Sequence, residues 1–226
     1  MMKVVVITGA SSGIGHEVAK LYNQKGYVLV LSGRNQDGFK DLSGKNIDLV
    51  LGDLTDQKVI EKLASVVEKK YGKIDVLINN AGITFIQPFE ENTPEQLDLI
   101  INVNLKSHIL LTSWLYPLMK KQRFGHIVFV NSSSGKEGYK NHTLYATTKF
   151  GLVGFAKSLR QETRQYNIKV TSVHPGGVKT NLYQNLKTPV DISAFMEPKP
   201  VAEAIVSLTE SSGYCPDELI LSRMTK

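Results

Sequence analysis

The sequence contains very little cysteine and no long hydrophobic run. Among its 226 residues, Cys215 is the single cysteine and cannot form a disulfide within the chain. This usage is typical of proteins in the reducing cytoplasm. No apolar run approaches the roughly 18 residues of a membrane span, and residues 1–7 lack the small-residue cleavage site of a signal peptide. The sequence therefore predicts a cytoplasmic protein that does not bind membranes.

Concentrated charge and metal-binding spacings are also missing. The chain carries 27 Lys and Arg against 21 Asp and Glu, but the basic residues are scattered, with short doublets such as Lys69-Lys70. A nucleic-acid surface would need clustered basic residues and stacking aromatics, so we expect no nucleic-acid partner. No group of His, Cys, Asp and Glu has the spacing of metal ligands, so we expect no metal site. The net charge of +6 would still attract a phosphorylated cofactor.

What the chain does contain is a regular alternation of strand and helix patterns. Apolar runs without alternation predict strands that are buried on both faces, as in a parallel sheet. No composition break or linker interrupts the pattern, so we expect one α/β domain over residues 1–226, a doubly wound Rossmann-type fold with a mostly parallel sheet and helices on both faces. Residues 181–198 show no periodicity and predict a substrate flap. The predicted strands cover 4–8, 27–31, 47–51, 75–78, 125–130, 168–174 and 218–221, and the later helices cover about 55–70, 94–121, 144–166 and 200–211.

A glycine-rich turn lies directly between the first strand and a helix that runs to residue 24. Glycines there permit a tight turn, close approach of a pyrophosphate and close helix packing. The unpaired N–H groups of the helix N-terminus would face the anion. The turn predicts a dinucleotide site that includes Gly9, Ser11, Ser12, Gly13, Ile14 and Gly15.

The residues after the second and third strands bear on the choice of dinucleotide. Arg34 suits a 2′-phosphate, and Asn35 follows it, so we expect NADP(H) to be preferred over NAD(H). Asp37 argues the other way, because it could approach an unphosphorylated ribose. Asp53 could accept a hydrogen bond from the adenine amino group, and it could also cap the helix that begins at Thr55 or Asp56, since the two roles are compatible.

Small residues after other buried strands would also let the backbone approach a ligand. The sequences at 79–82 and 175–180 are of this kind. Together with the residue after Asp53, they complete the predicted cofactor contacts, which are Leu54, Asn80, Ala81, Gly82, Pro175, Gly176, Val178 and Thr180.

Tyr145 and Lys149 are spaced i, i+4, so on a helix they share one face. A phenol titrates near ~10, and a nearby cation lowers that pKa, so the pair could act as a general acid/base. The same spacing recurs at residues 116/120 and 183/187, but only Tyr145 follows a strand whose end carries serines. Strand ends are where α/β proteins keep their chemistry, and a hydroxyl there could hold a substrate carbonyl.

Asn104 is a polar residue on the apolar face predicted for the helix at 94–121. A buried amide needs hydrogen-bond partners. It could tie the helix to neighbouring backbone, or it could hold a water near the active site.

Together these motifs resemble those of the short-chain dehydrogenase/reductase family over nearly the whole chain. The matching patterns are TGxxxGxG at 8–15, NNAG at 79–82, YxxxK at 145–149, a serine thirteen residues upstream at 132, the helix asparagine at 104 and the PG turn at 175–176. The resemblance implies that Tyr145 donates the proton in reduction and that Ser132, rather than Ser133 or Ser134, hydrogen-bonds the substrate oxygen. It implies that Lys149 binds the nicotinamide ribose and lowers the tyrosine pKa. Asn104 would anchor a water that links the lysine to solvent.

Two features depart from the family pattern. Many members that use NADP have a basic residue in the glycine turn, where this chain has Ser12, so phosphate recognition would rest on Arg34 with Ser12, Ser32 or Asn35 assisting. Longer relatives use a C-terminal tail in tetramer contacts, whereas this chain ends soon after the last strand. By analogy we expect a homodimer through the long helices, with a homotetramer as the alternative.

The resemblance implies an NADPH-dependent reductase of a ketone, aldehyde or diketone, a small-molecule carbonyl substrate. One alternative is a 3-oxoacyl-thioester reductase of fatty acid synthesis. An alternative from another class is a non-catalytic NADP-binding sensor or scaffold. The residues expected to contact substrate are Ser134, Tyr139, Gly177, Leu182 and Tyr183.

Overall fold

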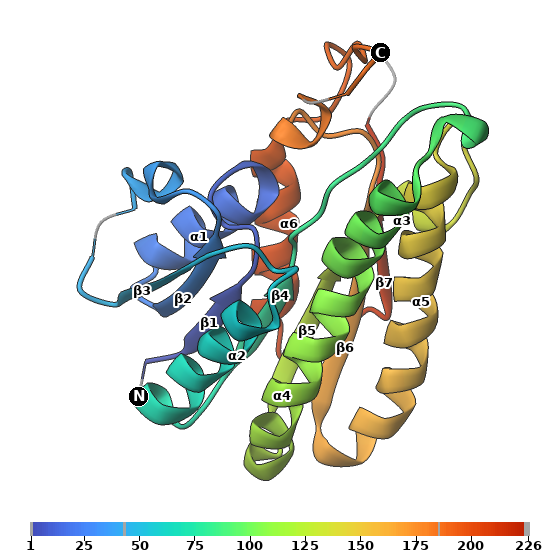
Figure 1. Cartoon of the computed structure of the whole chain (residues 1–226). Coiled ribbons are helices and arrows are strands. Elements are labelled where there is room, and N and C mark those ends of the chain that lie inside the picture. Colours follow the sequence, from blue (N-terminus) through green and yellow to red (C-terminus); the bar gives the residue numbers. More distant parts are fainter. Residues whose placement is uncertain (1, 43, 185, 224–226) are drawn as a thin grey trace.

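The computed structural model describes residues 2–42, 44–184 and 186–223; residue 185 of the predicted flap lies outside them. A parallel sheet of seven strands forms the centre of this described chain, in the order β3-β2-β1-β4-β5-β6-β7 (Figure 1). Every position of β1 and β5 is buried, as the runs without alternation predicted. The strands are β1 Val4–Ile7, β2 Val28–Gly33, β3 Ile47–Leu51, β4 Val76–Asn79, β5 Gly125–Val130, β6 Ile168–Pro175 and β7 Glu218–Leu221.

Helices cover both faces of this sheet (Figure 1). Helices α1 (Gly13–Gln24) and α6 (Pro198–Glu210) pack against each other and share one apolar core with the sheet. Helices α2 (Gln57–Val66), α4 (Ser107–Gln122) and α5 (Thr143–Thr163) share the core on the other face. This confirms the doubly wound Rossmann-type fold.

The helix predicted over 94–121 consists of three consecutive segments. Helix α3 (Pro94–Ile101) begins with a capping box between Thr93 and Gln96, and a π-helical turn at Asn102–Lys106 leads into α4. Such turns are frequent at functional sites. The turn contains Asn104, whose side chain faces the segment after β4.

The strand order reverses between β1 and β4, and this positions the ligand site. Because both strands neighbour each other and run parallel, the turns at their carboxyl ends meet. Thr8, after β1, accepts hydrogen bonds from the backbone N–H groups of Asn80 and Ala81, after β4, at 2.9 and 3.1 Å. A crevice at such a switch point is where open α/β sheets bind ligands.

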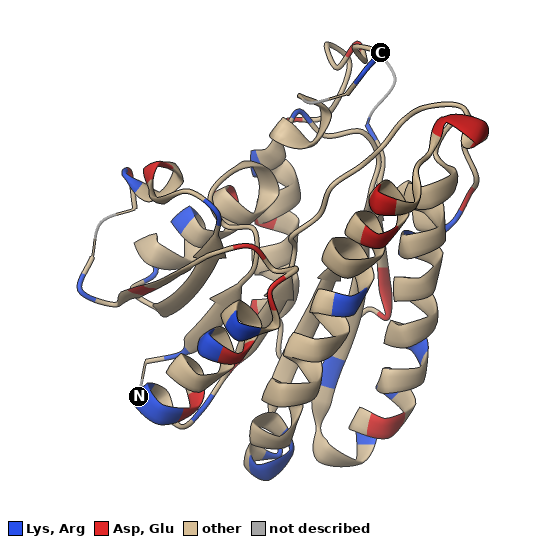
Figure 2. Ribbon diagram, viewed as in Figure 1, with Lys and Arg blue, Asp and Glu red and all other residues tan. Residues whose placement is uncertain are grey.

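The surface carries interspersed charges of both signs. Figure 2 shows that blue positions of Lys and Arg and red positions of Asp and Glu alternate along the ribbon. Several of these residues form ion pairs, such as Lys70 with Asp48 at 2.6 Å. Within the described ranges, none of the helices has the length and apolar character that crossing a membrane requires.

Candidate active site

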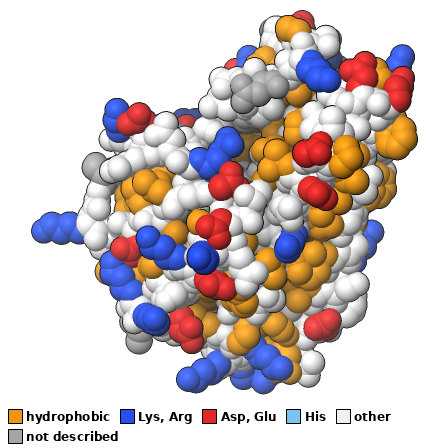
Figure 3. Space-filling view, viewed as in Figure 1, with side chains coloured by type: hydrophobic (Ala, Val, Ile, Leu, Met, Phe, Trp, Pro, Cys, Tyr) orange, Lys and Arg blue, Asp and Glu red, His pale blue; other side chains and the backbone are white. Residues whose placement is uncertain are grey.

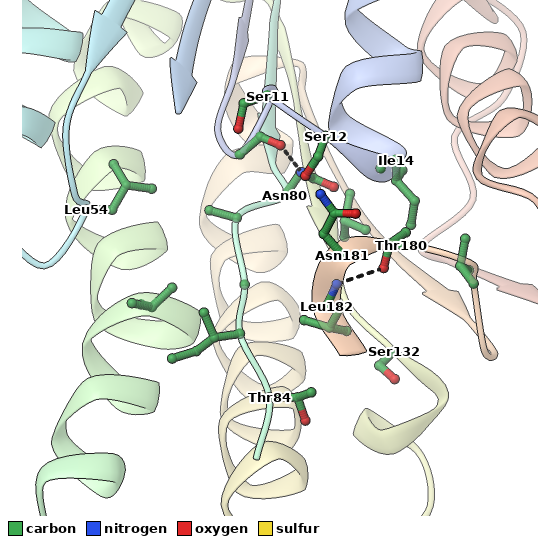
Figure 4. A pocket seen from close by; sticks show the side chains of 18 of the residues that line it. Ser11, Ser12, Ile14, Leu54, Asn80, Thr84, Ser132, Thr180, Asn181 and Leu182 are labelled. Carbon is green, nitrogen blue, oxygen red and sulfur yellow. Dashed lines mark hydrogen bonds between the residues drawn. The ribbon is translucent and has the colours of Figure 1, made fainter. Parts of the chain in front are cut away.

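A cavity of about 400 Å³ opens at the carboxyl ends of the central strands (Figure 4). It brings together residues from turns that are far apart in sequence. The predicted site residues that line it are Gly9, Ser11, Ser12, Gly13, Ile14, Arg34, Asp53, Leu54, Asn80, Ala81, Gly82, Ser132, Tyr145, Lys149, Pro175, Gly176, Val178, Thr180, Leu182 and Tyr183.

The turn between β1 and α1 is built on glycines at positive φ. Gly9 has φ +63° and Gly13 has φ +58°, a region that favours glycine. A Cβ at Gly9 would lie 2.8 Å from the Cα of Ala81, and one at Gly13 would lie 2.9 Å from Thr180 Cγ2. Ser12 is the N-cap of α1, yet its side chain makes no capping hydrogen bond to the described helix. The helix therefore presents N–H groups to the cavity without a side-chain acceptor of its own.

Gly15 does not line the cavity. A Cβ at this position would lie 2.4 Å from Asn80 Nδ2 and 2.6 Å from the carbonyl oxygen of Gly9. The Asn80 amide donates to the carbonyls of Thr8 and Gly9 at 3.0 and 3.1 Å. Gly15 thus allows the helix to pack against a hydrogen-bonded amide that holds the turn.

Near the end of β2, Arg34 lines the cavity but Asn35 does not. The Asn35 side chain instead accepts a hydrogen bond from the Asp37 backbone N–H at 2.9 Å and caps a short 3-10 turn. The Asp37 carboxylate pairs with Lys40 at 2.9 Å. Arg34, directly after β2, is therefore the charged side chain that this turn contributes to the cavity.

Asp53 lines the cavity and does not cap the following helix. Its carboxylate accepts from the Thr55 N–H at 2.9 Å, within the loop. The N-cap of α2 is Asp56, which accepts from the Lys58 N–H at 2.9 Å. The expected capping role of Asp53 is wrong, because α2 begins at Gln57 rather than at Thr55 or Asp56.

Ser132, Tyr145 and Lys149 converge at the other end of the cavity. Ser132 follows β5, and its hydroxyl accepts from the Ser134 N–H at 3.1 Å. Tyr145 and Lys149 come from the first turns of α5 and are 8% and 3% exposed. The Lys149 ammonium donates to the carbonyl of Val130 at 3.1 Å and lies 5.5 Å from the centroid of the Tyr145 ring.

Burial dominates the electrostatics of this pair. It raises the pKa of Tyr145 above its usual value; the nearby Tyr183 raises it further, and a hydrogen bond with Ser132 lowers it. Burial lowers the pKa of Lys149 to about 8. Burial is thus the largest influence on both groups, and a lowering of the tyrosine pKa by the lysine stays a prediction.

Asn104 is fully buried and clamps the segment that follows β4. Its Oδ1 accepts from the Ile83 N–H and its Nδ2 donates to the Ile83 carbonyl, both at 2.8 Å. The Nδ2 also donates to Thr148 Oγ1 at 3.2 Å, next to Lys149. Of the two roles considered for Asn104, the structure shows the first: the side chain joins its helical turn to the backbone of Ile83.

The wall beside the catalytic residues is mainly apolar. Leu182 and Tyr183 line it as expected, together with Ile83, Phe85, Leu99 and Val103. The Tyr183 ring packs edge-on against Phe195, with centroids 5.3 Å apart. Leu182 donates its N–H to Thr180 Oγ1 at 3.3 Å, which Figure 4 shows as a dashed line.

Three expected substrate residues lie outside the cavity lining. Ser134 is buried in the turn behind Ser132. Tyr139 is exposed and packs edge-on against His142. Gly177 packs under the Phe195 ring, where a Cβ would lie 2.7 Å from ring carbons.

The cavity also contains polar residues that the motifs did not indicate. Thr84 and Asn181 line it, and both are labelled in Figure 4. Asn181 directly follows the segment 175–180 and is the first residue of the predicted flap, so it had a sequence signal, whereas Thr84 lies two residues beyond the segment 79–82 and had none. In the chain as described, no group of three or more His, Cys, Asp and Glu side chains is arranged to hold a metal ion.

Comparisons of sequence and of structure with known proteins both find short-chain dehydrogenases and reductases, over most of the chain. The family model for short chain dehydrogenase matches residues 3–191. The chain is 36% identical to a 3-oxoacyl-[acyl-carrier-protein] reductase of Thermotoga maritima, over 96% of this chain and 95% of that protein. Among solved structures, a 3-ketoacyl-(acyl-carrier-protein) reductase from Brucella melitensis complexed with NADH has a TM-score of 0.89 at 28% identity, covering 97% and 96% of the chains. A serine dehydrogenase complexed with NADP+ has a TM-score of 0.85 at 25% identity, covering 96% and 94%.

Proposed function

The chain belongs to the short-chain dehydrogenase/reductase family, and on this basis we propose that it is an NADPH-dependent oxidoreductase that reduces a ketone, aldehyde or diketone to the alcohol. The observation that carries the proposal is the convergence of Ser132, Tyr145 and Lys149 in one cavity. The opposite end of that cavity is a glycine turn at a helix N-terminus. One end can position a carbonyl, and the other can bind a dinucleotide.

The residues present fit a dinucleotide. At Gly9 and Gly13, both at positive φ, a Cβ would collide with Ala81 and Thr180, so glycine lets the turn pack closely against the other cavity segments. The N-terminus of α1 would hold the pyrophosphate. Arg34 would pair with a 2′-phosphate, and this is our reason to propose NADP(H) over NAD(H). The complexes of structural neighbours with NADH and NADP+ support dinucleotide binding without favouring either form.

A bound nicotinamide supplies the hydride. Ser132 donates its hydroxyl proton in a hydrogen bond to the substrate carbonyl oxygen and orients it. Tyr145 then transfers its phenolic proton to the oxygen that becomes the alcohol. The phenol is protonated at neutral pH, as a proton donor must be, although its raised pKa makes it a weaker acid than a phenol in water. The Lys149 ammonium stabilises the phenolate that remains.

Asn104 acts in this scheme as a positioning residue. Its two hydrogen bonds to Ile83 fix the wall of the cavity, and its bond to Thr148 fixes the turn of α5 that carries Lys149. We keep as part of the proposal that it also supports a water near the lysine.

A 3-oxoacyl thioester is the second candidate substrate. The observation in its favour is the similarity to 3-oxoacyl-carrier-protein reductases in both the sequence and the structure comparison. The serine dehydrogenase among the neighbours shows that the fold alone does not select a substrate.

The assembly and the location of the protein are further parts of the proposal. Figure 3 shows hydrophobic side chains gathered over the α3–α4 face, and Phe150 on α5 is exposed. These features support a homodimer or homotetramer through the long helices. The free thiol of Cys215 supports a reducing compartment, the cytoplasm.

The experiment that tests the proposed function is NADPH oxidation by the purified protein with a panel of carbonyl compounds. The panel holds ketones, aldehydes, diketones and 3-oxoacyl thioesters, and NADH is tested in parallel. We expect turnover with NADPH on at least one class, and the preferred class decides between the two candidates. Tight NADPH binding without turnover on any class would favour the non-catalytic sensor or scaffold instead.

A further inference from the structure

The catalytic end of the cavity contains one phenol that the proposed reaction does not use. Tyr183 lines the same cavity as Ser132 and Tyr145. It belongs to the 3-10 turn Asn181–Tyr183, on the wall contributed by the segment after β6. Its phenol lies near enough to Tyr145 to raise the pKa of that residue. Two phenols therefore face one reaction space.

The ring of Tyr183 is held in place by packing. Phe195 contacts it edge-on, and Phe195 in turn lies over Gly177, where there is no space for a Cβ. The backbone of the neighbouring Met196 is bonded to Gly177 and Lys179, at 2.9 and 2.8 Å. This places the phenol on a braced support rather than at a free loop tip.

The hydroxyl of Tyr183 has hydrogen-bonding capacity to spare. Among the residues that the structure describes, the Tyr183 hydroxyl has no hydrogen-bond partner, and its oxygen is accessible from the cavity or from solvent. Lys187, at the i+4 spacing that resembles the catalytic pair, is directed elsewhere and pairs with Glu91 at 3.7 Å. Burial raises the pKa of Tyr183, so at neutral pH the group is a neutral donor and acceptor.

We propose that Tyr183 is a specificity-determining residue that binds a second oxygen on the substrate, close to the reacting carbonyl. Ser132 and Tyr145 already serve the reacting oxygen, and the remaining lining nearby combines the apolar Ile83 and Leu182 with the single hydroxyl of Thr84. A substrate with one oxygen would leave the Tyr183 hydroxyl unpaired against that wall, and unpaired polar groups in a site penalise the wrong ligand. The substrate class is thus a dicarbonyl or hydroxycarbonyl compound rather than a simple ketone. This inference rests on the proposed function.

The test compares two substrates of equal length, a diketone and the matching monoketone, with the wild type and Tyr183→Phe. The substitution removes one oxygen and keeps the ring that packs on Phe195. We expect kcat/KM for the diketone to fall about tenfold or more, with the monoketone changed less than about threefold. Tyr139→Phe is the matched control, because that tyrosine is exposed and outside the cavity lining, and neither substrate should respond to it.

Equal losses on both substrates, or no loss on either, would overturn the inference and leave the proposed function standing. A lack of Tyr145-dependent turnover on every substrate would overturn the proposed function itself. In that case, the affinity of the diketone for the protein with NADP+ still decides the role of Tyr183. Calorimetric titration that gives equal affinities for wild type and Tyr183→Phe would refute it, and weaker binding by the variant would support it.

Discussion

Burial acts in opposite directions on the two ionisable residues at the catalytic end of the cavity. It raises the pKa of the Tyr145 phenol and lowers that of the Lys149 ammonium to about 8. Both shifts favour the uncharged form, which in the tyrosine is the proton-donating form. The phenol therefore holds its proton tightly, and proton transfer to a carbonyl oxygen depends on stabilisation of the resulting phenolate by the Lys149 ammonium.

The pKa of Lys149 predicts a pH dependence of stability. Below pH 8 the folded and unfolded chains both carry the ammonium, and its burial costs free energy. Between about pH 8 and 10.5 the folded chain has released the proton while the unfolded chain retains it, so the contribution of this group to the free energy of unfolding rises with pH. Lys149→Met should be the more stable protein at pH 7, by at most about 3 kcal/mol, and the gap should narrow towards pH 10. Urea unfolding of both proteins at the two pH values measures this, and a constant gap would contradict it.

Arg34 should determine the preference for the phosphorylated dinucleotide. In Arg34→Asp the carboxylate would repel a 2′-phosphate and suit a ribose hydroxyl, so the ratio of kcat/KM for NADPH to that for NADH should fall roughly 10- to 100-fold. Asn35→Ala is the control, because the Asn35 side chain caps a turn outside the cavity lining and should leave the ratio unchanged. An unchanged ratio in Arg34→Asp would place phosphate recognition elsewhere.

Motifs identified where the site lies better than how each residue behaves. The glycine turn, the serine after β5 and the tyrosine–lysine pair all line one cavity, because parallel strands bring their carboxyl ends to one edge. The pKa direction of Tyr145 was not predictable, since it depends on how completely the fold excludes water. Thr84 also escaped prediction, because nothing in its local sequence shows that the clamp on Ile83 directs it to the cavity.

At the scale of elements, the β1–α1 turn depends on close packing at two glycines, Gly9 and Gly13.

The bounds of helices were predicted well where the capping residues are encoded locally, as at Thr93 and Gln96. Helix bounds were predicted less well where tertiary contacts decide them. The π-helical turn at Asn102–Lys106 has no local signature in the sequence, and it places the Asn104 side-chain amide where it binds the backbone of Ile83.

Gly13→Ala should weaken dinucleotide binding. The new Cβ would meet Thr180 Cγ2 at 2.9 Å, so the turn or the segment after β6 must shift at the cavity wall. We expect at least about a tenfold loss of NADPH affinity, in addition to a cost on the order of 1 kcal/mol for the positive φ. NADPH fluorescence titration and thermal unfolding measure the two effects.

Gly26→Ala is the matched control for this substitution. Gly26 has φ +74°, but within the described residues a Cβ there has no neighbour within 4 Å. Its replacement should cost similar stability and leave NADPH affinity unchanged. Equal losses of affinity in both variants would show that general strain, not the fit of the turn, controls binding.

At the scale of the whole molecule, one sheet supports both ends of the site, and the long helices α4 and α5 pack on one of its faces (Figure 1). The strand order was predictable as a class because strand–helix–strand units connect with one hand. The assembly is a separate matter, because an exposed apolar side chain does not identify its partner.

The proposed dimer predicts a specific effect of charge on the long helices. Phe150 is 47% exposed on α5, and Gly154, one turn further, has open space over its Cα. Phe150→Glu should convert a dimer to a monomer, because the interface would bury an unpaired charge. Phe89→Glu changes another exposed ring, on the 3-10 turn Phe89–Glu91 before α3, and should leave the dimer intact. Sedimentation velocity gives the masses, and an intact dimer in Phe150→Glu would place the interface elsewhere.

The central claim, that Tyr145 transfers the proton in a carbonyl reduction, is tested most directly by Tyr145→Phe. The change removes one oxygen from a buried ring, so the fold and the dinucleotide site should persist. We predict that NADPH affinity stays within about threefold of the wild-type value, while turnover on the best carbonyl substrate falls by a factor of roughly 1,000 or more. General acid–base catalysis contributes about 10²–10⁴-fold, so a larger loss would show that the role of Ser132 also depends on the phenol. Turnover equal to that of the wild type, with NADPH bound as tightly, would contradict the assignment.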